Sequence, residues 1–498
     1  MDTKALRQKI LDLAVRGKLV PQDPNDEPAS VLLERIREQK QQMVKEGKLK
    51  KKDIKNDSII FVGKDNLHYE KFQDGTVKCI EDEIPFEVPK GWAWSRLSSI
   101  ATIVTGRLDA NAQREDGDYP FFTCGEEVFR TNTFAFDCDA ILLGGNNAVG
   151  DFKIHRCCGK FNAYQRVYVI TPYGEIYPDY LYYHIKYYLP ALQKQSIGSQ
   201  TRYLKLGMVN DLLIACPPAC EQRDITLFTN KYFDLCTSIE TNKCEIKNMI
   251  SLMKSTILDL AIRGQLVPQN LDDEPASVLL ERIRVEKEEL IKQGKIKRDK
   301  KESVIFKGED NSYYEDIPKN WVLTTLSELT HPLILNDGDW ILSENMSSNG
   351  SVKLIRLGSI GEMQYVDKGF KYITEETFTN LRCTEIHSGY ILINRIINEK
   401  MNICILPNIE GKLITAVDAC WISPNNNYNL KYIMYALSSP TVQLQILLKA
   451  TGTTRKRISK HNLINIPIPF PPLDEQNRIV EVIEKSFTQL NKMINCLI

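Results

Sequence analysis

Residues 10–50 read ILDLAVRGKLVPQDPNDEPASVLLERIREQKQQMVKEGKLK, and residues 257–297 read ILDLAIRGQLVPQNLDDEPASVLLERIRVEKEELIKQGKIK. The two stretches are identical at 28 of 41 aligned positions, without a gap and at an offset of 247 residues. Self-similarity of this kind is the signature of a duplicated structural unit. We therefore expect the chain to contain two copies of one framework.

The likeness between the copies stops and then returns. It continues as far as VPKGWAWSRL (88–97) and IPKNWVLTTL (317–326), and after a divergent stretch it returns at PPACEQ (217–222) and PPLDEQ (471–476). Shorter matches join residues 57–70 to 302–315 and residues 198–205 to 452–459. This layout predicts framework segments that alternate with variable modules. The framework segments are residues 1–85, 218–316 and 472–498, and the first and second variable modules are residues 86–217 and 317–471.

The two chain ends divide a framework segment between them. The C-terminus corresponds to Cys244 and the N-terminus to Asn248 of the other copy. One copy of this framework segment is continuous and starts at Glu221. The other copy is divided: its first part is the end of the chain and its second part is the beginning of the chain. We expect a pseudo-twofold, circularly closed repeat in which the two chain ends lie close together.

The framework segments are expected to form long helices. Apolar side chains recur at heptad spacing from Glu221 over about 40 residues, which predicts a long helix that packs against another. This seam consists of Ile225, Phe228, Tyr232, Leu235, Ile239, Ile246, Met249, Met253 and Leu260, and Asn242 interrupts it. The C-terminal segment repeats the pattern at Ile483, Phe487, Leu490, Ile494 and Leu497. An antiparallel pairing of the two helices would bury both seams, and a helical hairpin inside one domain is the alternative.

A second helix is expected in each copy, within the repeat itself. The sequence DEPASVLLERIR places an acidic N-cap candidate, Asp26 or Asp273, ahead of an apolar stripe, and Gly47 or Gly294 follows as a stop signal. The variable modules combine short β-like runs with one amphipathic helix each, at residues 178–195 and 429–450. The predicted fold class is α/β (α+β), with two modules joined by long antiparallel helices.

Polar and basic residues gather at glycine-bearing turns of both modules. Their side chains are of the kinds that bind base edges (Arg, Asn, Gln, Ser, Thr) or phosphates (Lys, Arg). The candidates in the first module are Arg107, Asn146, Asn147, Gln165, Arg166, Gln200, Thr201, Arg202 and Lys205. Those in the second module are Arg356, Ser359, Asn394, Arg395, Thr454, Arg455, Lys456, Arg457 and Lys460. Five Lys or Arg and no acid lie between Gln445 and His461, which is the clearest basic patch of the chain.

Composition limits the other classes of protein. The chain has 498 residues, 64 Lys and Arg, and 64 Asp and Glu, so any attraction to nucleic acid has to be local. The sequence shows neither a secretory signal nor an apolar run long enough to span a membrane, which favours a cytoplasmic protein. Thirteen cysteines, an odd number, favour reduced thiols over a disulfide framework.

No catalytic centre is evident in the sequence. A phosphate-binding loop, a nucleophile elbow and a zinc-protease motif are all missing. The six histidines are scattered singly and the cysteines form no CxxC pair, so neither a catalytic site nor a metal site is predicted.

Two divergent modules between repeated long-helix segments, opened by P-x-G/N-W-x-x-x-x-L and closed by P-P-x-x-E-Q, resemble the specificity subunit of type I restriction-modification systems. The resemblance covers essentially the whole chain. It implies that each module is a target recognition domain for one half of a bipartite, asymmetric duplex DNA sequence. It also implies that the helices act as spacer and as docking surface for methyltransferase subunits, which a restriction/translocase subunit joins. S-adenosylmethionine, ATP and magnesium would then belong to those partners, and this subunit would hold no cofactor and no catalytic site.

Two other hypotheses stay open at this point. The duplicated modules would also suit a non-catalytic scaffold that binds proteins or small ligands. A single-chain restriction enzyme is disfavoured because the catalytic motifs are missing.

Overall fold

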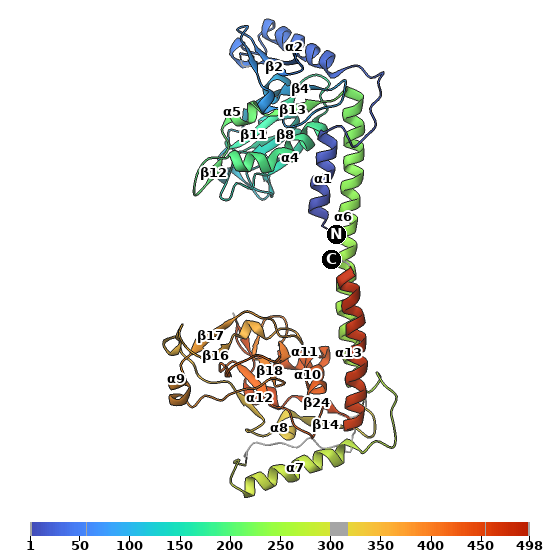
Figure 1. The fold of residues 1–498 in the computed structure, drawn as a ribbon, viewed down its shortest axis with the longest axis vertical. Helices are drawn as coiled ribbons and strands as arrows, with labels where there is room; N and C mark the ends of the chain where they lie inside the picture. Colours follow the sequence, from blue (N-terminus) through green and yellow to red (C-terminus); the bar gives the residue numbers. More distant parts are fainter. Residues whose placement is uncertain (1, 56, 299–316, 454, 497–498) are drawn as a thin grey trace. The chain divides into compact units, whose positions relative to one another are not determined.

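The computed structural model describes residues 2–55, 57–298, 317–453 and 455–496 (Figure 1). The chain folds as two compact units of mixed helix and strand, Met1–Lys243 and Cys244–Ile498. No helix among these described residues is long and apolar enough to cross a membrane.

The first variable module is built around a six-stranded sheet of order β5-β11-β8-β10-β6-β7. All neighbours are antiparallel except β10 and β6. Alternate residues of the central strand β8 enter two different cores, because successive side chains of a strand point to opposite faces. Helix α4 contacts β8, β10 and β11. The bounds are β5 Ala101–Thr105, β6 Tyr119–Phe122, β7 Val128–Thr131, β8 Phe136–Gly144, β10 Ile154–Ala163, β11 Val167–Pro172 and α4 Pro178–Gln195.

The second variable module places most of its strands in two smaller sheets, of orders β15-β22-β18-β20 and β17-β16-β21. The single helix expected at residues 429–450 is two helices, α10 and α11, because the chain turns at Ser439 before Pro440 restarts it. The bounds are β15 Leu335–Asp337, β16 Val352–Ile355, β17 Phe370–Ile373, α9 Glu375–Asn380, β18 Ile391–Asn394, β20 Ile403–Ile405, β21 Leu413–Thr415, β22 Ala419–Ile422, α10 Leu430–Ser438 and α11 Pro440–Lys449.

The framework helices follow the expected outline. Helix α6 runs from Ala219 to Ile262, and α1 (Thr3–Val15) packs beside its first part in unit 1, where the Arg7 guanidinium lies 2.6 Å from the Glu240 carboxylate. In unit 2, α13 (Leu473–Cys496) lies alongside the last part of α6 (Figure 1), and Lys254 Nζ donates to Asn491 Oδ1 at 2.6 Å. The predicted seam of α13 is buried at Ile483 and Leu490, and its Leu497 lies outside the described residues.

The predicted seam of α6, in contrast, is largely not the face that packs. Ile225 is buried, but much of the remaining seam is solvent-exposed, and Thr229 and Cys236 on a neighbouring face are buried instead. The heptad spacing identified a true apolar stripe but assigned it to the wrong contact. The exposed members are Phe228 (37%), Tyr232 (39%), Leu235 (56%), Met249 (61%) and Met253 (46%).

The second helix of each copy also forms as expected, as α2 (Ala29–Lys45) and α7 (Ala276–Lys292). Their caps differ from the prediction, because Pro28 and Pro275 occupy the N-cap positions and make no side-chain cap bond. Asp273 is instead buried, where its Oδ2 accepts a bond of 2.6 Å from the Arg478 guanidinium on α13. Gly47 and Gly294 follow the helix ends with φ of +74° and +69°, as a C-terminal stop requires.

A buried glutamate ties each variable module to its framework helix. The Trp92 indole donates to Glu221 Oε2 at 2.8 Å, and the Trp321 indole donates to Glu475 Oε2 at 2.9 Å. Glu221 is 4% exposed and Glu475 is fully buried, and burial raises the pKa of both carboxyl groups. These four residues come from the motifs that open and close the modules. The two sequence motifs are therefore the two sides of one contact.

The glutamine that ends the closing motif acts in the same place. Gln222 Oε1 accepts from the Tyr177 amide, and Gln476 Oε1 accepts from the Asn429 amide, both at 2.8 Å. Next to these contacts, β4 (Ala93–Arg96) pairs with β13 (Leu213–Cys216), and β14 (Val322–Thr325) pairs with β24 (Pro467–Phe470). The start and the end of each module are thus joined beside the framework helix. The short helices here are α3 Leu97–Ile100, α5 Leu206–Asn210, α8 Leu326–Leu329 and α12 Lys460–Ile464.

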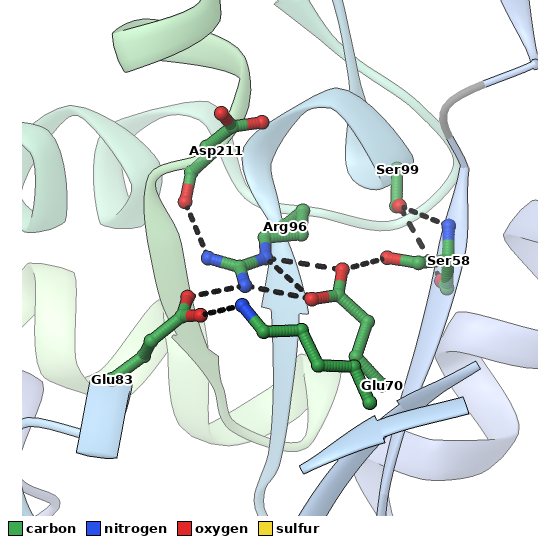
Figure 2. A network of polar contacts seen from close by, with 7 residues as sticks. Ser58, Glu70, Glu83, Arg96, Ser99 and Asp211 are labelled. Carbon is green, nitrogen blue, oxygen red and sulfur yellow. Dashed lines mark hydrogen bonds and ion pairs between the residues drawn. The ribbon is translucent and has the colours of Figure 1, made fainter. Parts of the chain in front are cut away.

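A polar network fixes a small sheet to the first module. Figure 2 shows the Arg96 guanidinium between the carboxylates of Glu70 and Glu83, each 2.7 Å away, with the Asp211 carbonyl as a further acceptor. Glu70 also accepts from the Ser58 hydroxyl. The sheet consists of β1 Ser58–Val62, β2 His68–Phe72 and β3 Val77–Cys79, and the matching residues 302–315 of the second copy lie outside the described residues.

Replacing Glu221 tests the buried tie. Glu221→Ala would leave the Trp92 indole N–H buried without its acceptor, which costs about 1 to 3 kcal/mol of unfolding free energy. Urea unfolding of the full chain should show this loss, and Glu475→Ala should show a similar loss through Trp321. The control is Asp224→Ala, an exposed acid on the same helix. Equal stability of Glu221→Ala and Asp224→Ala would contradict the assigned role.

Candidate nucleic-acid interface

The two variable modules share a backbone frame at their candidate residues. In the first module the Gly145 amide donates to the Arg166 carbonyl at 2.7 Å, and the Leu204 amide donates to the Gly145 carbonyl at 2.8 Å. In the second module the Arg395 amide donates to the Asp418 carbonyl at 2.9 Å, and the Ile458 amide donates to the Arg395 carbonyl at 3.0 Å. Gly145, Arg166 and Leu204 therefore correspond to Arg395, Asp418 and Ile458.

A pair of very short strands extends each frame. Strand β9 (Asn146–Asn147) pairs with β12 (Arg202–Tyr203), and β19 (Ile396–Ile397) pairs with β23 (Lys456–Arg457). The turn that leads into the second strand of each pair contains a glycine with positive φ, at Gly198 (+111°) and Gly452 (+108°). We call these surfaces the β9–β12 edge and the β19–β23 edge.

A glycine turn packs against the same frame in both modules. The Gly106 amide donates to the Val167 carbonyl at 3.1 Å, and the Gly338 amide donates to the Ala419 carbonyl at 2.7 Å. A Cβ atom on Gly106 would lie 2.1 Å from the Ala163 carbonyl oxygen, so any larger residue would push the two turns apart. A Cβ atom on Gly338 would lie 2.4 Å from the Ala416 carbonyl oxygen. Sequence positions far apart in the chain are thereby held in one surface.

The β9–β12 edge brings the first module's candidates together. Half-buried Asn147 is in register with half-buried Arg202, whose guanidinium also donates to the Gln193 carbonyl at 3.1 Å near the end of α4. Gln165 donates to the Asp109 carboxylate at 2.7 Å. Asn146 is also half-buried, and the exposed candidates are Arg107, Gln165, Arg166, Gln200, Thr201 and Lys205.

The β19–β23 edge gathers most of the cations among the second module's candidates. Arg455, Lys456 and Arg457 are exposed, and Arg457 Nε lies 2.8 Å from the Asp418 carboxylate. Lys460 is half-buried and donates to Asn336 Oδ1 at 2.6 Å. Asn394 is half-buried, and Arg356 is exposed directly after β16, whose Ile355 is in register with Thr415. Thr454 lies outside the described residues.

Two candidates do not reach the surface, which corrects the expectation for them. Ser359 is fully buried, and Arg395 is 3% exposed. The Arg395 guanidinium donates to the Val417 carbonyl at 2.5 Å and lies 3.2 Å from the Asp337 carboxylate. Arginine at a polar turn resembled a ligand-binding residue in the sequence, but here it holds the frame together.

The charges on the two frames are opposite at matched places. Gly106 is followed by exposed Arg107 in the first module, whereas Gly338 is followed by Asp339 in the second. Arg166 of the first frame corresponds to Asp418 of the second. The same backbone therefore presents arginines in one module and aspartates in the other.

A tryptophan next to the Gly338–Asp339 turn was missed in the sequence. Trp340 follows Asp339 and is 67% exposed. The available signal was a tryptophan within the polar stretch NDGDW (336–340), two residues after a glycine.

Within the described residues, no group of three or more His, Cys, Asp or Glu is placed to hold a metal ion.

Comparison with known proteins finds one family model that matches the chain twice. The family model described as "Type I restriction modification DNA specificity domain" matches residues 89–248 and 316–498. The specificity subunit of the type I restriction enzyme EcoEI from Escherichia coli is 27% identical, over 97% of this chain and 89% of its own length. The EcoAI specificity subunit from Escherichia coli is 30% identical, over 72% of this chain and 67% of its own length.

A solved structure shares the fold. It is described as "Structural basis underlying complex assembly and conformational transition of the type I R-M system", and the match has a TM-score of 0.50 at 13% identity. The match covers 83% of this chain and 94% of the solved chain.

The two arginines Arg395 and Arg356 separate a structural role from a surface role. Arg395→Ala would remove the donor that the Val417 carbonyl and Asp337 share, and we expect a loss of about 3 kcal/mol in unfolding free energy. Arg356→Ala, at an exposed site, should change stability by less than about 0.5 kcal/mol. Urea unfolding of both variants makes the comparison, and a stable Arg395→Ala chain would refute the structural role.

Proposed function

Because the chain belongs to the type I restriction-modification DNA specificity family, we propose that it is the DNA-reading subunit of a type I restriction-modification complex. It recognises a bipartite, asymmetric duplex sequence, with one variable module for each half. The target recognition domains are residues 86–217 and 317–471. The subunit itself is not an enzyme, and the methylation and cleavage reactions are carried out by its partners.

The matched frames of the two modules carry this proposal. Two homologous surfaces with one backbone arrangement and different side chains are suited to reading two different half-sites. Exposed Arg and Lys side chains bind phosphates and give affinity, whereas Asn, Gln and Arg side chains read base edges in the major groove. Because the net charge of the chain is zero, the cations of the two edges supply this attraction locally.

Methyltransferase subunits dock on the framework helices in this proposal. In unit 1, α6 exposes Leu227 (65%) and Leu235 (56%), and in unit 2 it exposes Met249 (61%) and Leu252 (67%). Exposed apolar residues repeated along a helix favour contact with another protein.

A restriction/translocase subunit joins the assembly, and the partners bind S-adenosylmethionine, ATP and magnesium. The long helices act as an antiparallel spacer in a circular, pseudo-twofold framework, and the complex works in the cytoplasm.

A duplicated scaffold that binds proteins or small ligands is the alternative function. The arginines, lysines and amides gathered at equivalent edges of both modules favour duplex DNA over it.

The basic turn of the second edge provides a test of phosphate binding. Arg455→Ala and Lys456→Ala should each weaken DNA binding and lower the slope of log affinity against log salt by about 1, because each removes one phosphate contact. Binding is measured with the assembled complex at several salt concentrations. Lys485→Ala, an exposed lysine on α13, serves as the control. An unchanged slope in both edge variants would place the phosphate contacts elsewhere.

Selection from random duplex DNA tests the function itself. The full chain, assembled with its methyltransferase partner, should enrich a motif of two different half-sites separated by a fixed spacer. If repeated rounds of selection enrich no bipartite motif, the result would contradict the proposed function and support the scaffold hypothesis.

A further inference from the structure

We propose that Trp340 contacts bases in the half-site that the second variable module reads, and thereby determines part of its specificity. This inference rests on the proposed function and names a residue and a mode of contact within it. The contact is apolar, either stacking on a base step or packing on a thymine methyl group.

The exposure of Trp340 is the first observation. All five tryptophans lie in the described part of the chain, and four of them are buried, with 3–7% of their surface exposed. Trp340 is 67% exposed. Burying a large aromatic side chain is favourable, so its exposure within the chain indicates a surface used for binding.

The residues on both sides hold Trp340 outward. Asp339 on one side is anchored, because its amide donates to the Thr415 carbonyl and its carboxylate accepts from the Thr384 amide, both at 2.8 Å. Ile341 on the other side packs against the buried cluster that contains Val352 and Ile373. Neighbours fixed in this way limit the conformations of the loop, and a pre-organised side chain loses less entropy on binding.

The surroundings of Trp340 favour DNA over a protein partner. The Gly338–Asp339 turn packs on the frame of the β19–β23 edge, whose Asp418 pairs with Arg457 and leads to exposed Lys456. Cations on that edge attract the phosphates of a duplex. A tryptophan next to this surface is therefore in a position to contact bases when the cations of the edge bind the DNA backbone.

Comparison with the first module explains why the contact is apolar. There the residues after the glycine are Arg107 and Leu108, and the matched frame position is Arg166, so this part of the surface is basic. In the second module the corresponding side chains are Asp339 and Asp418, which are already bound to the Thr384 amide and to Arg457, so this turn supplies no cation of its own for a phosphate contact. The side chain that projects from this turn is an indole, which contributes contact with base faces or methyl groups.

The test compares wild type, Trp340→Ala, Trp340→Phe and the control Leu333→Ala, each as full chain assembled with its methyltransferase partner. Leu333 is 56% exposed. It precedes β15, whereas Trp340 follows this strand. Trp340→Ala should lose base preference at one to three positions of one half-site and bind the cognate duplex about 5- to 150-fold more weakly. Its salt slope should stay unchanged, because no phosphate contact is lost. Trp340→Phe should recover part of the preference, and Leu333→Ala should behave as wild type.

Quenching of tryptophan fluorescence by acrylamide gives a second measure. Cognate duplex should protect the wild-type complex from quenching more than it protects the Trp340→Phe complex, because the four remaining tryptophans of the chain are already buried and the partner's tryptophans are the same in both. An unchanged motif in Trp340→Ala, with wild type still selecting a bipartite sequence, would overturn the inference and leave the proposed function intact. Weaker methyltransferase assembly with an unchanged motif would likewise overturn it, since Trp340 would then belong to a protein interface. Failure of wild type to select any motif would instead count against the proposed function.

Discussion

A buried carboxylate that accepts a hydrogen bond from a tryptophan indole holds each variable module to its framework. Glu221 and Trp92 make this contact in unit 1, and Glu475 and Trp321 make it in unit 2. The glutamate begins the framework helix and the tryptophan begins the module, so the contact fixes where a module starts relative to its helix. Loss of either partner would leave a buried polar group without its bond, which explains why both motifs occur in both copies.

With the modules fixed in this way, their outer edges are free to differ. The backbone frames around Gly145 and Arg395 use the same hydrogen bonds, yet the side chains they present differ in charge and polarity. Arg166 stands where Asp418 stands in the second module. A constant interior and a variable surface are what a subunit needs if it reads two unrelated half-sites with one fold.

The sequence predicted the framework better than the surface. The repeat, the long helix α6 and the helices α2 and α7 were expected, because helix periodicity and glycine stop signals are local in sequence. The packing face of α6 was not predicted correctly, because residue spacing identifies an apolar stripe but does not show which element packs against it. Arg395 and Ser359 were expected at the surface and are buried, because burial depends on contacts between distant segments. Trp340 was missed for the same reason.

Replacing one module by the other tests the central claim most directly. In a chain whose residues 317–471 are exchanged for a second copy of residues 86–217, both edges carry the same side chains. Selection from random duplex DNA, with the chain assembled with its methyltransferase partner, should then enrich a target in which both halves show the base pattern of the first half-site. An unchanged asymmetric motif from a correctly assembled chain would contradict the account, because specificity would not lie in the modules.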